Sequence, residues 1–250
     1  MTCKLCNKVK KLIKAHIIPE FLYRDIDLYI PDKKGQGRIH GFTNTNGNLK
    51  FIKKGLPTGI YDTTILCKEC DSLIIKEYDD YGKKIFTDLL NRETLQNAIE
   101  QKLQFLEFGL DDYFLFKTFI ASIFWRASIS NRPEFTIVKL NETEKIIKEI
   151  IKTRNPSLID MFEIVIFFLN IGLSNQILMN PIEVNKLNSH FFSFIAGGFL
   201  INLFPDKSKV LNAWSGFVIK NKNSFQMPII QDVETSKYII NSFIDSEILK

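Results

Sequence analysis

The chain has 250 residues, 45% of them hydrophobic, and a formal net charge of +5. This length allows one large hydrophobic core or two smaller ones. The longest apolar run, residues 191–204, is too short to span a bilayer and is broken by two glycines, so we expect no membrane segment. The sequence also lacks a phosphate-binding glycine loop, a nucleophile elbow and an internal repeat.

The positive charge is concentrated in the first quarter of the chain. Residues 1–60 hold twelve Lys and Arg against four Asp and Glu, a net charge of +8, so the remainder carries −3. Such a basic segment indicates a polyanion as partner, and nucleic acid, in particular DNA, is the expected one. The alternative is a solvated lysine face that only keeps the protein soluble. The basic residues that we assign to nucleic-acid binding are Lys8, Lys10, Lys11, Lys14, Arg38, Lys53 and Lys54.

The four cysteines form two CxxC pairs, Cys3 with Cys6 and Cys67 with Cys70. Each pair can place two thiolates on one turn, and two pairs complete a tetrahedral four-sulfur Zn²⁺ site. Two unrelated thiol pairs, or a redox CxxC as in thioredoxin-like proteins, are the alternatives. A disulfide is less favoured, because the lysine-rich segment around Cys3 and Cys6 leads us to expect no secretory leader. We therefore expect a structural zinc ion and a reducing, cytoplasmic location.

The predicted elements of the first third surround these cysteines. Residues 2–14 indicate a zinc knuckle followed by a short strand, and residues 21–61 form a long insertion. In it, alternation over residues 38–42 and 49–53 predicts a hairpin with an Asn-Gly turn. A helix is expected after the last cysteine, over residues 71–81.

These motifs resemble the zinc-ribbon form of the HNH endonuclease family. The resemblance covers residues 1–85 and depends on the two CxxC pairs and on His16, which directly precedes Ile-Ile-Pro. It implies a ββα-metal, treble-clef-like unit. It also implies that His16 is a general base that activates water against a phosphodiester, with a divalent ion, Mg²⁺ or Mn²⁺, stabilising the phosphate. Without this motif, His16 would be interpreted as a core residue or as a neighbour of the zinc site.

The carboxylates of this unit depart from the family pattern. Ala15 stands where many members have a metal-binding Asp, and Asp62 stands where an Asn is usual. The helix after Cys70 has no histidine and offers Asp71 and Glu77 as ligands, and Asp71 is equally suited to cap the helix. The residues allow two interpretations: a carboxylate-rich active site formed by His16, Asp62, Asp71 and Glu77, or a degenerate one.

Residues 86–250 predict a second domain, of mixed helices and antiparallel sheet. Helices are expected over residues 91–108, 112–130, 142–153 and 233–248, and strands over 164–169, 191–203 and 213–219. Arg126, near the end of the buried second helix, is expected to pair with an acid or a helix terminus. The predicted fold is thus α+β, with a zinc module over residues 1–85 followed by a domain over 86–250.

Two functions from different classes follow. The first is a metal-dependent HNH-like nuclease acting on nucleic acid, in a setting such as bacterial defence. The second is a non-catalytic zinc module that binds nucleic acid or protein, and the missing Asp and His ligands favour it. A redox CxxC protein is a distant third. The C-terminal domain leaves a second copy of the chain or another protein open as a partner.

Overall fold

The computed structural model describes residues 1–24, 29–31, 37–39, 42–45, 48–51, 60–89, 92–170, 178–186, 188–232, 234–236 and 238–239. Helices and strands both contribute to the core, which confirms the α+β class. Within these ranges, no helix combines the length and the apolar character that crossing a membrane requires.

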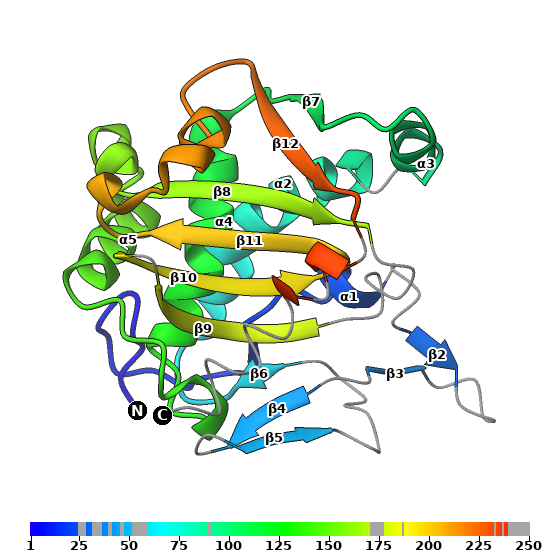
Figure 1. Cartoon of the computed structure of the whole chain (residues 1–250). Coiled ribbons are helices and arrows are strands. Elements are labelled where there is room, and N and C mark those ends of the chain that lie inside the picture. The colour runs from blue at the N-terminus through cyan, green and yellow to red at the C-terminus, as the bar shows by residue number, and fades with distance from the viewer. Residues whose placement is uncertain are drawn as a thin grey trace.

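A six-stranded sheet lies at the centre of the larger part of the molecule (Figure 1). Its strands, in spatial order, are β7 (Phe105–Gly109), β12 (Ser224–Ile230), β8 (Glu163–Leu169), β11 (Phe199–Phe204), β10 (Ser189–Ala196) and β9 (Leu178–Lys186). Neighbouring strands run antiparallel except β12 and β8, which are parallel. The strands predicted over residues 164–169 and 191–203 are confirmed, the second as two strands.

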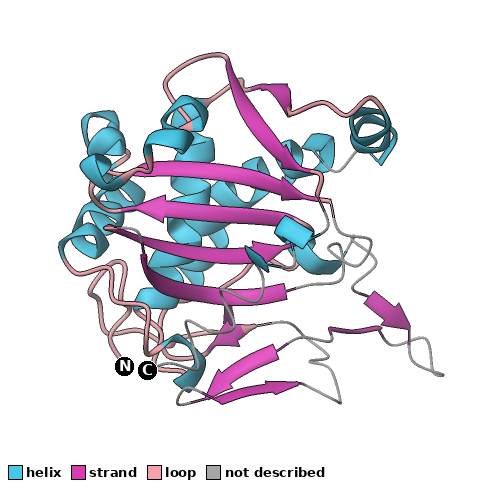
Figure 2. Ribbon diagram, viewed as in Figure 1, coloured by secondary structure: helices cyan, strands magenta, loops and turns pink. Residues whose placement is uncertain are grey.

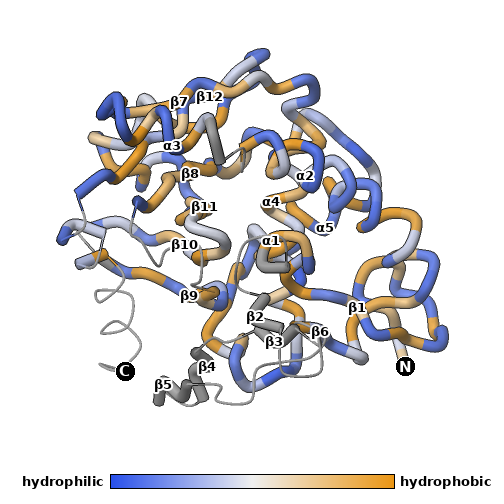
Figure 3. The backbone as a smooth tube through the Cα atoms, turned by 90° about the vertical axis from the view of Figure 1, so that its right-hand side faces the viewer, coloured by the Kyte–Doolittle hydropathy of each residue, from blue (hydrophilic) through white to orange (hydrophobic). Residues whose placement is uncertain are grey.

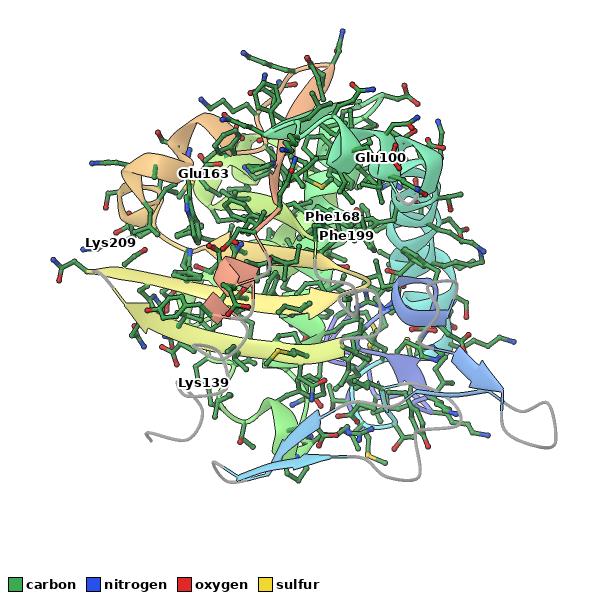
Figure 4. The ribbon with its side chains drawn as sticks, turned by 45° about the vertical axis from the view of Figure 1, so that its right-hand side comes forward. Glu100, Lys139, Glu163, Phe168, Phe199 and Lys209 are labelled. Atoms are coloured by element: carbon green, nitrogen blue, oxygen red, sulfur yellow. The ribbon has the colours of Figure 1, made fainter. Side chains whose placement is uncertain are left out.

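The two faces of the sheet carry different sets of apolar side chains, because successive residues of a strand point to opposite faces. In β8, Ile164, Ile166 and Phe168 belong to the core on the helical side. The intervening residues of β8 belong to a second apolar cluster on the other side. Phe168 lies beside Phe199 of β11, with ring centroids 5.6 Å apart (Figure 4).

Three helices cover the first face: α2 (Lys76–Leu89), α4 (Tyr113–Ser128) and α5 (Glu142–Thr153). Figure 3 shows them beside the sheet when it is viewed from the side. Helix α4 is apolar around most of its circumference and nearly all of it is buried. The Asp112 side chain caps its start by accepting a hydrogen bond from the Leu115 N–H (2.9 Å). The predicted helices over 112–130 and 142–153 are confirmed.

Glycine is required where two segments meet closely or turn sharply. A Cβ atom on Gly82 of α2 would lie 2.5 Å from the Phe119 ring of α4, so this glycine permits the close packing of the two helices. Gly197 and Gly198 join β10 to β11 with φ angles of 60° and 81°, a conformation that strains other residues.

The opposite face of the sheet is covered by irregular segments that follow β11. They include two 3-10 helices, Lys207–Lys209 and Asn212–Phe217. The strand predicted over residues 213–219 is therefore wrong. Trp214 of this segment packs edge-on against Phe167, with ring centroids 4.8 Å apart. The aromatic residues that led to the prediction of a strand here instead cover one face of the sheet.

Two further predictions need correction. The helix expected over residues 91–108 ends early, as α3 (Arg92–Glu100), and β7 follows it, because residues 105–109 pair with β12. In the insertion, the hairpin joins β4 (Phe42–Thr45) to β5 (Asn48–Phe51), whereas β3 (Gly37–Ile39) pairs with β2 (Tyr29–Pro31). Of the helix expected over 233–248, residues 234–236 and 238–239 are described and are helical, and the others lie outside the described residues.

The cysteine-bearing segments pack at one end of the helical layer (Figure 2). They contain β1 (Ala15–His16), α1 (Phe21–Arg24) and β6 (Tyr61–Asp62), followed by a π-helical turn over Cys70–Ile75 that continues into α2. One cluster of buried apolar side chains extends from Cys3 through α2 and α4 to the sheet. The division into domains 1–85 and 86–250 stays a prediction.

Candidate metal centre and histidine site

The four cysteines come together at one point, and their geometry fits a zinc ion. Their sulfur atoms all lie within 4.8 Å of one another, and Cys6 Sγ is 4.0 Å from Cys67 Sγ. A tetrahedral site with Zn–S bonds of about 2.3 Å places its sulfurs about 3.8 Å apart. All four are free thiols, and three of them are buried. The predicted ligand set, Cys3, Cys6, Cys67 and Cys70, therefore forms a candidate structural zinc site.

Backbone contacts bring the two cysteine pairs together across the long insertion. Asn7 adopts a left-handed conformation (φ 59°) directly after Cys6, and its N–H donates to the Cys3 carbonyl (2.9 Å), which closes the first knuckle. Asn tolerates this conformation better than most residues. The N–H of Lys4 donates to Ile65 O (2.8 Å), and the N–H of Cys67 donates to Cys3 Sγ (3.4 Å).

The surroundings of Cys3 favour a thiolate. Burial raises the pKa of its thiol, but hydrogen bonds from the backbone of Cys6, Cys67 and Leu5 outweigh that rise and lower the pKa to about 7. A thiolate is the form that binds zinc.

His16 follows Leu12, which bridges to Cys67, by four residues and lies on a two-stranded ladder. In it, Ala15 pairs with Asp62 and His16 pairs with Tyr61. Directly opposed residues of antiparallel strands share a face. Ala15 and Asp62 are buried on the inner face, whereas His16 and Tyr61 are half-buried on the outer face. Among the described residues, the His16 ring has no hydrogen-bond partner.

Asp62 lies on the inner face, and both oxygens of its carboxylate accept hydrogen bonds, some of them from a separate segment of the chain. Its carboxylate accepts hydrogen bonds from the N–H and hydroxyl of Thr64, both at 2.7 Å, from the Ser130 hydroxyl (2.6 Å) and from the Asn131 N–H (3.2 Å). Burial opposes ionisation, but these bonds from Ser130 and Thr64 prevail and lower the pKa of Asp62. The carboxylate ties β6 to the end of α4.

Asp71 is the candidate carboxylate that lies close to His16. It sits in the π-helical turn, where the Lys76 N–H donates to its carbonyl. It is inside this turn, and the cap position is occupied by Glu69. Burial raises the pKa of Asp71; the charges of Arg126 and His16 oppose that rise and Asp79 adds to it. Its side chain has no hydrogen bond to any described residue.

Asp79 and Arg126 complete the surroundings of His16. The guanidinium of Arg126 donates to both carboxylate oxygens of Asp79, at 3.0 and 2.9 Å, and also to the backbone carbonyl of His16 (3.0 Å). The Arg126 side chain is 1% exposed. The sequence predicts that Arg126 pairs with an acid or a helix terminus, and the structure shows that the partner is Asp79, which lies in the same predicted helix as Asp71.

The remaining predicted residues form other contacts, are exposed, or lie outside the described residues. Glu77 forms an exposed ion pair with Arg154, beyond the end of α5. Lys10 pairs with Glu69 of the second knuckle, whereas Lys8, Lys11 and Lys14 are exposed. Arg38 lies in β3, of whose side chains nothing is described, and Lys53 and Lys54 fall outside the described residues.

Among the described residues, the carboxylates and His16 do not by themselves form a second ion site. Within the described ranges, the four cysteines are the one group of three or more His, Cys, Asp or Glu side chains with ligand atoms close enough to share an ion. A comparison with models of protein families, with curated proteins and with solved structures finds no match.

Proposed function

We propose that the chain is an HNH-like, metal-dependent nuclease that hydrolyses phosphodiester bonds in nucleic acid. The observation that carries the proposal is the position of His16. It lies on the outer face of the β1–β6 ladder, four residues after the Leu12 bridge to Cys67, with a half-buried ring that has no hydrogen-bond partner among the described residues. A general base needs such a free nitrogen close to the attacking water.

His16 and the residues around it have separate roles in the proposed reaction. His16 accepts the proton of a water whose oxygen attacks phosphorus. The bond from phosphorus to the leaving oxygen breaks, and that oxygen keeps the electron pair and takes a proton from solvent water. Arg126 holds the His16 peptide in place from within the core, because it binds the His16 carbonyl and is fixed by Asp79. Asp62 holds the opposite strand, so it acts as a structural residue in this scheme.

A catalytic Mg²⁺ or Mn²⁺ would take Asp71 as its protein ligand. Mg²⁺ usually keeps several waters and binds through one or two carboxylates together with the phosphates of the substrate. An incomplete protein ligand set is therefore compatible with such an ion. When bound, the ion would polarise the phosphate and stabilise the charge that develops during attack.

The alternative is a non-catalytic zinc module that binds nucleic acid or protein. The observation in its favour is that the described carboxylates near His16 do not form an ion site of their own. In this case His16, Asp71 and Asp79 are remnants that now only support the zinc module.

Cleavage assays with matched variants distinguish the two functions. We expect wild type to cleave plasmid or single-stranded DNA with Mg²⁺ or Mn²⁺, and His16→Ala to lower the rate by about 10²-fold or more. Asp71→Asn should raise the metal concentration that is required. Glu77→Gln and His190→Ala are the controls, because Glu77 pairs with Arg154 and His190 pairs with Glu183 on the sheet.

Equal residual activity in wild type and His16→Ala, with zinc content and fold unchanged, would contradict the nuclease. Binding of nucleic acid without His16-dependent cleavage would support the zinc-module alternative.

A further inference from the structure

Lys14 and Tyr61 form a cationic group on the same face as His16. Lys14 precedes His16 by two residues, so the alternation of an extended chain places both on one face. Tyr61 is the partner of His16 across the ladder. The Lys14 ammonium lies over the Tyr61 ring, 3.8 Å from its centroid. This distance is typical of a cation–π contact, which restricts where a lysine side chain can go.

Tyr61 is held in place by the segment that follows α4. Arg132 donates to the Tyr61 carbonyl (2.6 Å) and lies 5.9 Å from the centre of the Tyr61 ring. The neighbouring Asp62 is fixed by Ser130 and Asn131 of the same segment. The platform under Lys14 is therefore built by residues from both halves of the chain.

Lys14 differs from the neighbouring described cations Arg132 and Lys10 because its charge is not paired with any described acid. Arg132 is paired with Glu134, whose side chain is only 13% exposed. On the first knuckle, Lys10 is paired with Glu69. Lys14 is exposed and forms no ion pair with any described residue. A cation–π contact leaves the N–H groups of the ammonium free to bind an anion.

We propose that Lys14, seated on the Tyr61 ring, binds a backbone phosphate of the nucleic-acid strand whose neighbouring phosphate is presented to His16. This inference rests on the proposed function and adds a substrate contact to it. Phosphate contacts fix the register of a strand on a protein without reading its sequence. Lys14 would thus set which phosphodiester reaches His16, and Tyr61 would act as the positioning residue for Lys14.

The test is a binding measurement in which the chemistry is switched off. Each variant is made in the His16→Ala background, and fluorescence anisotropy follows binding of a labelled duplex oligonucleotide over a range of NaCl concentrations. Lys14→Gln should reduce the slope of log K against log salt by about 0.9 and weaken binding about eightfold at 0.1 M salt. Lys152→Gln, an exposed lysine at the end of α5, is the matched control and should leave both unchanged.

A double-mutant cycle tests the role of Tyr61. Tyr61→Leu should weaken binding. The double variant, Lys14→Gln with Tyr61→Leu, should bind no more weakly than Lys14→Gln alone, because the two changes remove the same contact. Fully additive losses would overturn the assignment of Tyr61 as a positioning residue.

A salt slope that Lys14→Gln does not change, or no binding even at low salt, would overturn the proposal. A lost phosphate contact in a protein that shows no His16-dependent cleavage would leave Lys14 as a binding residue and would contradict the nuclease alone.

Discussion

Helix α4 carries two buried cations that the protein treats differently. Arg126 and Lys117 have side chains that are 1% and 0% exposed. They are nine residues apart, about two and a half turns, so they lie on opposite sides of the helix. Arg126 faces the cysteine-bearing segments and Lys117 faces the start of β8, where Glu163 is labelled in Figure 4.

The two environments differ in whether the acidic partners of the cation have other contacts once the cation is removed. Lys117 contacts the Tyr113 hydroxyl (2.9 Å), Glu163 (3.2 Å) and Asp160 (3.5 Å). These acids have other support, since Tyr113 donates to Asp160 and Lys207 lies 3.7 Å from Glu163. Asp79 has no partner other than Arg126 among the described residues. The comparison indicates that the Arg126 side is the more fragile of the two.

The largest effect should come from removing zinc. Structural zinc contributes about 10 kcal/mol or more in small zinc domains, so we expect chelation to unfold the segments that the cysteines join. Hydrogen exchange should then accelerate in residues 1–20 and 60–75 and, more weakly, around Arg126. Strands β8, β10 and β11 and the region of Lys117 should stay protected.

Freshly purified protein should contain about one equivalent of zinc, and adding zinc back should restore the original protection. Less than half an equivalent, or exchange rates that chelation leaves unchanged, would contradict the zinc site.

The next effect should be that of Arg126→Met. It leaves the Asp79 carboxylate, whose side chain is 21% exposed, without its partner. Breaking a buried pair in this way costs about 3–5 kcal/mol, and the partial exposure of Asp79 places the expected cost at the lower end. The free energy of unfolding from denaturant titration measures it. Adding Asp79→Asn should recover part of the loss, because the unpaired charge is then gone. An Arg126→Met loss no larger than that of Lys117→Met would refute the comparison.

The sequence predicts best what depends on local periodicity. The helix over 142–153 has isoleucines at helical spacing, and the strands over 164–169 and 191–203 are rich in β-branched and aromatic residues, so the sequence predicts all three elements. The error over 91–108 has a non-local cause. Residues 105–109 become a strand because they pair with residues 224–228, and nothing in the local sequence shows that partner.

In the candidate site, too, the sequence predicts the features that depend on local structure and misses those that depend on tertiary packing. The spacing of the cysteines predicts which side chains come together, because a knuckle is a local structure and zinc accepts few other ligand sets. The contact between Asp79 and Arg126 joins residues 47 positions apart and depends on how α2 packs on α4. The use of Asp62 likewise depends on Ser130 and Asn131, which approach it only in the folded chain.

A smaller effect is expected at Asp62, where the cysteine-bearing segments meet the end of α4. Asp62→Asn should cost about 1–3 kcal/mol at pH 7, because a charged acceptor of several hydrogen bonds is lost. Since the fold lowers the pKa of Asp62, its contribution is present above the ordinary value of 3.8 and is lost as pH falls through the folded pKa. The difference between wild type and Asp62→Asn should therefore shrink below pH 3.8. A difference that stays constant down to pH 3 would contradict this role.

The smallest effect at neutral pH should be that of Lys117→Met. A methionine of similar length fills the space, and the acids keep their other partners, so we expect a change within about 1 kcal/mol.

The pH dependence of the free energy of unfolding distinguishes Lys117 from Arg126. Burial lowers the pKa of Lys117 below 10.5, and the acids Glu163 and Asp160 oppose that shift. The unfolded chain then binds more protons than the folded one between the folded pKa and 10.5, so the contribution of Lys117 to stability rises with pH in this window. Tyr113, whose pKa burial raises above its usual value of 10, should not interfere below pH 9.5. Denaturant titrations of wild type and Lys117→Met from pH 7 to pH 9.5 measure the difference, in which the pH dependence of the zinc site cancels. The free energy of unfolding of wild type should increase relative to the variant towards alkaline pH. A constant difference would mean that Lys117 keeps its proton throughout, held by Glu163 and Asp160 as firmly as Asp79 holds Arg126.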